Sequence, residues 1–133
     1  MIQNKATKLD KILVNFGMVT KVHAIAIVSK DGFIIASILD GSLQDNGGNF
    51  FNDELIAGMA AEMAILGERT TQELLKTVPQ RIIIDSDMGT IVLITAGKEA
   101  VIIAVMDREH LGYTLMHLQR LARETETILL LQN

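Results

Sequence analysis

The side chains that most often carry chemistry are sparse in this sequence. Cysteine is absent, and histidine occurs three times, at His23, His110 and His117. His110 and His117 could share a helix face, but without a carboxylate fixed beside them they make a poor metal site. Asp85 and Asp87 flank a predicted turn, where aspartate commonly bonds its own backbone. We therefore expect no catalytic residue, no metal site and no cofactor.

The motifs of phosphate, nucleotide and hydrolytic chemistry are also missing. The chain contains no G-x-x-x-x-G-K-[ST], G-x-G-x-x-G, G-x-S-x-G or H-E-x-x-H pattern. Its formal net charge is −4 and aromatic residues make up 4% of it, so it lacks the positive charge and the stacking surfaces that bind nucleic acid. We expect a protein that binds other proteins. We do not expect it to be an enzyme or to bind nucleic acid.

Length and hydropathy limit the organisation of the chain. A sequence of 133 residues fits one domain, residues 1–133. Hydrophobic residues make up 49%, which is high for a soluble domain and predicts an apolar surface that a partner covers. The longest apolar run, residues 100–106, is far shorter than the roughly 18 residues needed to span a bilayer, so we expect no direct membrane insertion. The polar start of the chain and the lack of cysteine favour the cytoplasm.

Hydrophobic periodicity then gives the elements. Amphipathic helices are predicted at residues 5–16, ending at Gly17, at 54–76 and at about 110–130. Strands are predicted at 22–28, 33–38, 81–86, 90–96 and 100–107, and Asp31-Gly32 supplies a tight turn between the first two. Residues 39–52 are rich in glycine and asparagine and are predicted to form a long, mobile surface loop. The order is αββαβββα.

The last three strands are apolar on both alternating faces, so the sheet must be covered on both sides. Five strands span roughly 20 Å, whereas one helix covers about 10 Å. If two helices cover one face, the third leaves half of the other face bare. This shortfall and the apolar strand at Ile82, Ile83 and Ile84 predict a homodimer that closes the sheet through that edge.

The middle helix has two informative sides. Its apolar arc, expected to lie on the sheet, contains Ile56, Met59, Ala60, Met63, Gly67 and Leu74. On the opposite arc, Gly58, Ala61 and Ile65 form a smooth stripe bordered by charges, as expected where another backbone approaches closely. The predicted partner contacts are Glu54, Gly58, Ala61, Glu62, Ile65 and Arg69. A solvated face with one stray isoleucine is the alternative. We expect a core position for most of Met59, Met63, Met88, Met106 and Met116.

Several short motifs carry a family resemblance that spans roughly residues 9–129. They are the strand and turn at residues 24–32 with Ile34-Ile35-Ala36-Ser37 after it, the small-residue helix at 57–61, the turn and strand at 89–93, and Leu111-Gly112. With the αββαβββα order, these motifs resemble the roadblock/dynein light-chain family, particularly its prokaryotic MglB-like members, which regulate Ras-like GTPases.

The resemblance implies a three-layer α/β/α fold with a five-stranded antiparallel sheet in the order 2-1-5-4-3. The first and last helices would cover one face and the middle helix the other. It also implies a homodimer in which the third strands pair and the middle helices lie side by side, with a small Ras-like GTPase as partner. Activation and scaffolding both occur in the family, and we assign no arginine finger, although Arg69 lies on the proposed contact face. The competing interpretation is a small-ligand sensor domain with a PAS-like α/β fold.

Overall fold

The structure is a computed structural model that describes residues 4–39 and 52–131, so the loop predicted at residues 39–52 lies outside this part apart from its two end residues. The elements follow the predicted order with small differences at their ends. They are α1 (Lys5–Val19), β1 (Val22–Ser29), β2 (Ile34–Leu39), α2 (Asp53–Leu75), β3 (Arg81–Ser86), β4 (Gly89–Ala96), β5 (Ala100–Met106), the short 3₁₀ helix η2 (Arg108–His110) and α3 (Leu111–Leu130).

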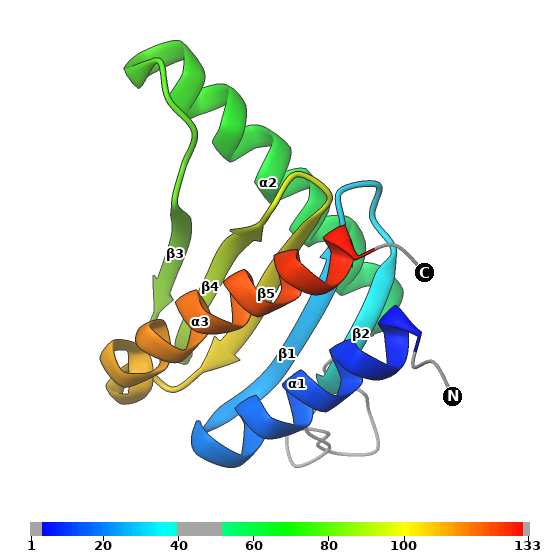
Figure 1. Ribbon diagram of the computed structural model, residues 1–133. Coiled ribbons are helices and arrows are strands. Elements are labelled where there is room, and N and C mark those ends of the chain that lie inside the picture. Colours follow the sequence, from blue (N-terminus) through cyan, green and yellow to red (C-terminus); the bar gives the residue numbers. More distant parts are fainter. Residues whose placement is uncertain (1–3, 40–51, 132–133) are drawn as a thin grey trace.

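The five strands form one antiparallel sheet in the order β2-β1-β5-β4-β3, which confirms the expected topology. In its centre Ile27 of β1 lies opposite Ile102 of β5, which in turn lies opposite Ile94 of β4. Helices α1 and α3 cover one face of this sheet and α2 crosses the other, so the fold has three layers (Figure 1). No helix within residues 4–39 and 52–131 is long and apolar enough to cross a bilayer.

The helix ends have local causes. The side chain of Asn52 accepts a hydrogen bond of 3.0 Å from the Leu55 amide and so caps the N-terminus of α2. The helix ends at Leu75 because Lys76 adopts the left-handed conformation, with φ of 58°. The expectation that Gly17 ends α1 is wrong, because the helix continues to Val19 and Thr20 caps it through bonds to the Phe16 carbonyl.

The predicted turn between β1 and β2 is present. The Ser29 amide donates to the Phe33 carbonyl at 2.8 Å, and the Gly32 amide donates to the Ser29 carbonyl at 2.9 Å. Gly32 has φ of 94°, a conformation that residues with a Cβ rarely adopt. This glycine therefore fixes the conformation of the turn, which lies against α2.

Each face of the sheet has its own apolar core. Against α1 and α3, large side chains pack together, including Leu9, Leu13, Phe16, Ile25, Ile102, Leu118 and Leu121. Against α2, most of the helix side of the core is alanine, with Ala57, Ala60 and Ala64 packed on Ala26, Val28, Val101 and Ile103. The sheet-facing side of α2 is thus built mainly from alanine, and the larger apolar side chains of α2 lie mostly outside this core.

Candidate protein-interaction surface

The edge strand β3 presents unpaired backbone and apolar side chains. Among the described strands it pairs with β4 alone, and the exposed fractions of Ile83 and Ile84 are 42% and 41%. Side chains alternate along a strand, so Ile82 and Ile84 face the α2 layer and Ile83 faces the α3 side. The structure therefore places all three isoleucines on a free sheet edge, a position that natural proteins usually protect with charge, proline or a partner.

Helix α2 leaves much of β3 uncovered. It packs mainly on β1, β2, β4 and β5, and in Figure 1 it runs obliquely across the sheet so that its C-terminal end lies beyond β3. It contacts β3 closely at Gly67, where an added Cβ would lie 2.6 Å from Cδ1 of Ile82. Beyond this point Leu74, Leu75 and Val78 are exposed. The expected shortfall in cover is therefore found at this edge.

The prediction of the buried face of α2 is partly wrong. Ile56 and Ala60 are buried as expected, but Met59 and Leu74 are 44% and 76% exposed. Ala57, Ala61 and Ala64 are buried instead, so the helix is rotated about its axis toward these alanines. The physical reason is size: small side chains let the helix axis approach the sheet closely, and the larger apolar residues then remain on the outside.

The stripe predicted for a partner chain is interrupted. Ala61 is only 6% exposed, so its place among the proposed partner contacts is wrong, whereas Gly58 is partly buried and Ile65 is exposed. The backbone that approaches Gly58 and Ala61 belongs to the same chain, because a Cβ on Gly32 would lie 3.9 Å from both of them. An ion pair of 2.9 Å between Lys30 Nζ and Glu68 Oε1 also joins the β1–β2 turn to α2.

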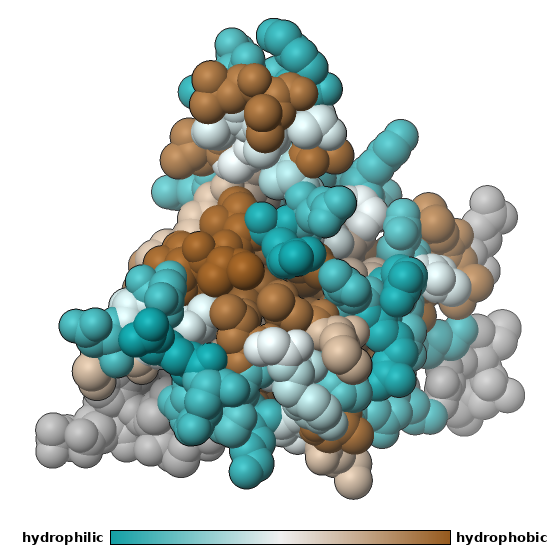
Figure 2. Space-filling view, turned by 90° about the vertical axis from the view of Figure 1, so that its left-hand side faces the viewer, coloured by the Kyte–Doolittle hydropathy of each residue, from teal (hydrophilic) through white to brown (hydrophobic). Residues whose placement is uncertain are grey.

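A different set of residues forms the exposed apolar part of α2. Leu55, Met59 and Leu66 are spaced by four and seven residues, so they lie on one side of the helix, and all three are exposed. We call them the outer stripe. Met63, which lies one turn before Gly67, and Ile82 both pack against the α2 core, and they connect the outer stripe with β3. In Figure 2, which views the molecule from the β3 side, hydrophobic surface gathers over this region and at the far end of α2.

Sequence reasoning missed the outer stripe because α2 has two apolar arcs. The four- and seven-residue spacing that marks Leu55, Met59 and Leu66 was visible, but periodicity alone does not say which arc faces inward. The prediction that most methionines fill the core is also wrong, and the two arcs of α2 account for Met59 alone, because Met88 lies in the β3–β4 turn and Met116 in α3. Met106 is buried and Met63 partly buried, but Met59, Met88 and Met116 are exposed.

The histidines and carboxylates are arranged differently from the expectation. His23 Nε2 lies 2.8 Å from Asp107 Oδ1, and this hydrogen bond lowers the pKa of Asp107 below its usual value. His110 Nε2 lies 3.7 Å from Glu109 Oε1. Two of the three histidines thus have a carboxylate partner, which the sequence analysis did not predict. His117 instead lies against Tyr113 and Arg120.

Asp85 and Asp87 have different surroundings in the structure. Asp85 accepts a hydrogen bond of 3.2 Å from Thr90 Oγ1 and forms an ion pair of 3.0 Å with Nε of Arg108. Asp87 lies exposed in the turn between β3 and β4. Asp85 therefore ties the edge hairpin to the segment that precedes α3, which is a structural role.

Known proteins share this architecture. MglB from Myxococcus xanthus superposes with a TM-score of 0.83 at 14% identity, covering 100% of this chain and 97% of that one. An MglB with a tetrameric arrangement superposes with a TM-score of 0.82 at 16% identity, covering 96% of this chain and 92% of that one. In sequence, protein MJ1340 of Methanocaldococcus jannaschii is 23% identical over 120 residues, which are 90% of this chain and 98% of the relative.

These similarities agree with a match to one family model. The model described as the Roadblock/LC7 domain covers residues 8–107, which include the whole sheet, α2 and most of α1. Because that match extends over well more than half of the 133 residues, the chain belongs to the Roadblock/LC7 domain family.

Proposed function

We propose that this chain is a single roadblock domain that works in the cytoplasm as a homodimer, and that the dimer binds a small Ras-like GTPase and regulates or scaffolds it. It acts by binding and not by catalysis. The observation that carries the proposal is the free edge of β3, with exposed Ile83 and Ile84, continuous with the outer stripe of α2. An apolar surface of this kind next to an open sheet edge is typical of a site that another chain covers.

A second copy is the occupant that fits this surface. Two antiparallel β3 strands related by a two-fold axis would pair their backbones and extend the sheet across both protomers. The same axis would bring the two outer stripes together, since a two-fold interface joins one surface patch to its own copy. A stable interface buries about 1,600 Å² in total, which is the area that strand and helix would have to bury together.

The GTPase part of the proposal rests on the family resemblance, because a shared fold alone does not choose a partner. With Ala61 removed, the proposed contacts on α2 are Glu54, Gly58, Glu62, Ile65 and Arg69. Their support is that Ile65 remains exposed beside charged residues after the hairpin turn has covered Ala61. Ile65 is not part of the outer stripe, whereas Glu62 and Arg69, which lie four residues before and three residues after Leu66, border it. Of the proposed GTPase contacts, Ile65 is therefore the one used to separate the two associations.

Sedimentation of the purified chain at micromolar concentration tests the dimer. We expect about twice the chain mass of 14.6 kDa. Leu66→Asp places a carboxylate in the proposed apolar contact and should weaken dimerisation by tenfold to thousandfold. The matched control is Met116→Asp, which changes an equally exposed apolar residue on α3 and should leave the mass unchanged. A wild-type monomer would refute the dimer.

Titration with Ras-like GTPases of the same organism, loaded with either nucleotide, tests the partner. We expect saturable binding that depends on the nucleotide, because regulators of such proteins contact the segments that differ between the two states. If the dimer forms but no GTPase of the set binds in either state, the GTPase part is wrong and the dimer part stands.

A further inference from the structure

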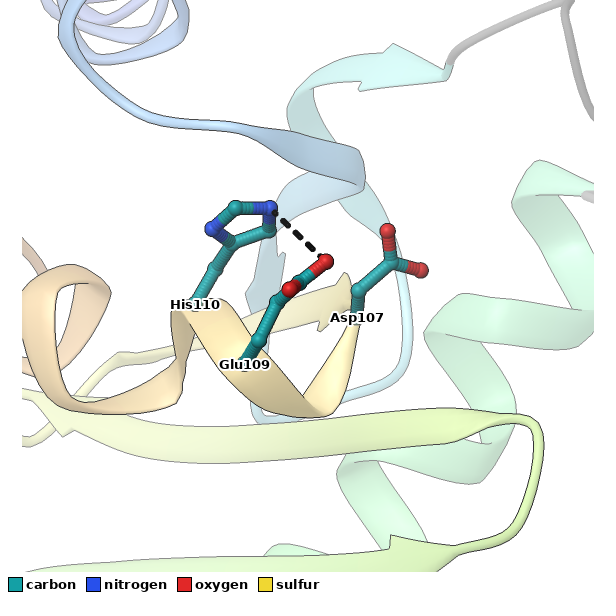
Figure 3. A group of neighbouring side chains, drawn as sticks. All are labelled: Asp107, Glu109 and His110. Carbon is teal, nitrogen blue, oxygen red and sulfur yellow. Dashed lines mark ion pairs between the residues drawn. The ribbon is translucent and has the colours of Figure 1, made fainter.

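Three metal-ligating side chains converge where β5 ends and α3 begins. Asp107 follows β5 directly, and Glu109 and His110 belong to η2. One ligand atom of each lies within 4.8 Å of the other two, and Figure 3 shows Glu109 and His110 directed toward one another on the short helix beside Asp107. The compact turn of η2 is what brings three donors from four consecutive residues together.

A fourth donor comes from a distant part of the chain. His23 Nε2 lies 2.8 Å from Asp107 Oδ1, across 84 residues of sequence. The register between β1 and β5 shifts between Val22 and Ala24, which leaves His23 out of the regular pairing. Such bulges redirect a side chain, and they are frequent beside functional sites. This irregularity turns the His23 imidazole toward the Asp107 carboxylate.

The chemistry of the four groups selects a class of ion. Two carboxylates and two neutral imidazoles carry a charge of −2, which a divalent cation neutralises. Mixed nitrogen and oxygen donors suit Zn²⁺ and related transition metals, whereas Mg²⁺ and Ca²⁺ take oxygen ligands. The ligand atoms of Asp107, Glu109 and His110 lie within 4.8 Å of one another, whereas donors around Zn²⁺ stand about 3.3 Å apart, so closure of these three needs a movement of up to about 1.5 Å. Glu109, whose side chain is 76% exposed, is free to make it. His23 lies outside this group of three and joins it through Asp107, since its Nε2 lies 2.8 Å from Asp107 Oδ1.

We propose that His23, Asp107, Glu109 and His110 form a binding site for Zn²⁺ or a similar divalent transition metal. The site joins the start of β1 to the junction between β5 and α3. Its four residues are not among the proposed contacts with the second copy or the GTPase, although Glu109 lines the same shallow pocket as Ile83 of β3. Zinc binding is measured on the chain itself, so its outcome does not decide whether the dimer or the GTPase complex forms. The bound ion cross-links two segments that are far apart in sequence and so stabilises the fold.

Calorimetric titration of the chelator-treated full chain with ZnCl₂ is the primary test. We expect one ion per chain with micromolar affinity, and a rise in Tm of roughly 10 °C when free zinc exceeds its Kd a hundredfold. Imidazole NMR signals add a readout that nonspecific binding would not give. The signals of His23 and His110 should shift on binding, and the His117 signal should stay in place.

The three histidines provide matched variants. His23→Ala and His110→Ala should each weaken zinc binding at least tenfold. His117→Ala is the control and should bind as the wild type, since this imidazole lies against Tyr113 and Arg120. Melting of each metal-free variant shows whether it is folded, and Glu109→Gln, which changes an exposed side chain, replaces any histidine variant that is not. It too should bind at least tenfold more weakly.

Three results would overturn the site. They are a wild-type Kd for zinc weaker than about 1 mM, unchanged affinity in a folded variant of any of the proposed ligands, and an equal loss of affinity in His117→Ala.

Discussion

The two faces of the sheet are covered in different ways. On one face α1 and α3 lie side by side and bury large residues such as Leu13, Phe16 and Leu118. On the other face α2 alone packs through alanines, and β3 with the outer stripe stays exposed. The first face is covered by two helices apart from the β3 edge, where Ile83 is exposed, whereas one helix leaves more apolar surface exposed on the second. Most of the large buried residues thus lie on one face of the sheet, and the exposed apolar residues of α2 lie on the other.

The comparison predicts that a leucine-to-alanine change has a different dependence on protein concentration on each of the two faces. Leu118→Ala on the closed face should lower the free energy of unfolding by about 2–5 kcal/mol, because it removes fully buried contacts and leaves a cavity. The loss should not depend on protein concentration. Leu66→Ala makes the same change on the open face, and its effect should shrink as dilution separates the protomers. Urea unfolding at two protein concentrations distinguishes the two variants. If Leu66→Ala lowered the free energy of unfolding equally at both concentrations, the division of roles between the two faces would be contradicted.

A second prediction separates the two uses of the open face. Ile65→Asp should leave folding within about 0.5 kcal/mol of the wild type, because Ile65 is 55% exposed. GTPase binding should fall by tenfold to thousandfold, since an unpaired carboxylate is costly in a desolvated contact. Dimerisation should be unaffected. Leu66→Asp should instead weaken dimerisation. Sedimentation measures dimerisation, and titration measures GTPase binding.

Either of two outcomes would change this view of α2. If Ile65→Asp alters neither association, Ile65 lies on a solvated face of α2 and contacts no partner chain. If it disrupts the dimer as strongly as Leu66→Asp does, a single broad interface covers the helix, and the GTPase contact lies elsewhere.

A third prediction concerns the anchoring of β3. Gly89 has φ of 149°, and an added Cβ would lie 2.8 Å from the Met106 carbonyl oxygen. Gly89→Ala should therefore cost about 1–3 kcal/mol of stability, because the clash is with backbone that cannot move aside easily. Since β3 is held mainly by β4, hydrogen exchange should accelerate most in β3 and β4. Gly112→Ala, where an added Cβ meets nothing within 4 Å, is the control. Protection unchanged in Gly89→Ala would refute this account of the edge.

Local signals in the sequence were enough for much of the fold. Turn residues such as Asp31-Gly32 mark the strand ends, and the β3 boundaries at Arg81 and Ser86 match the prediction. The sheet order came from the family resemblance and is confirmed, and the Roadblock/LC7 match decides against the PAS-like alternative. The edge position of Ile82, Ile83 and Ile84 followed from the same reasoning, and their pairing with a second chain stays a prediction.

The parts that failed depend on contacts between distant segments. The rotation of α2 depends on how closely the alanines approach the sheet, and the sequence of α2 alone contains two apolar arcs. Gly58 and Ala61 were predicted to meet the backbone of a partner chain, but the backbone that lies against them is that of Gly32 in the chain's own hairpin. The contact between His23 and Asp107 depends on a register shift between β1 and β5, for which the periodicity of neither strand gives a signal.

The smallest predicted effect tests the flank of α2 that the chain closes by itself. Lys30 and Glu68 join the β1–β2 turn to α2 at 2.9 Å, and both side chains are about one-third exposed. A pair exposed to this extent is worth roughly 0.2–1 kcal/mol, because water and salt screen it. A double-mutant cycle with Lys30→Gln and Glu68→Gln, followed by thermal melting, should give a coupling energy in that range that falls as salt is raised. Lys98→Gln, which changes an exposed lysine in the β4–β5 turn, should not couple to Glu68→Gln. Coupling of several kcal/mol would mean that this flank is held by the ion pair and not by the packing of Gly32 on Gly58 and Ala61. The flank that faces the chain's own hairpin would then be as dependent on one contact as the open flank is on a partner.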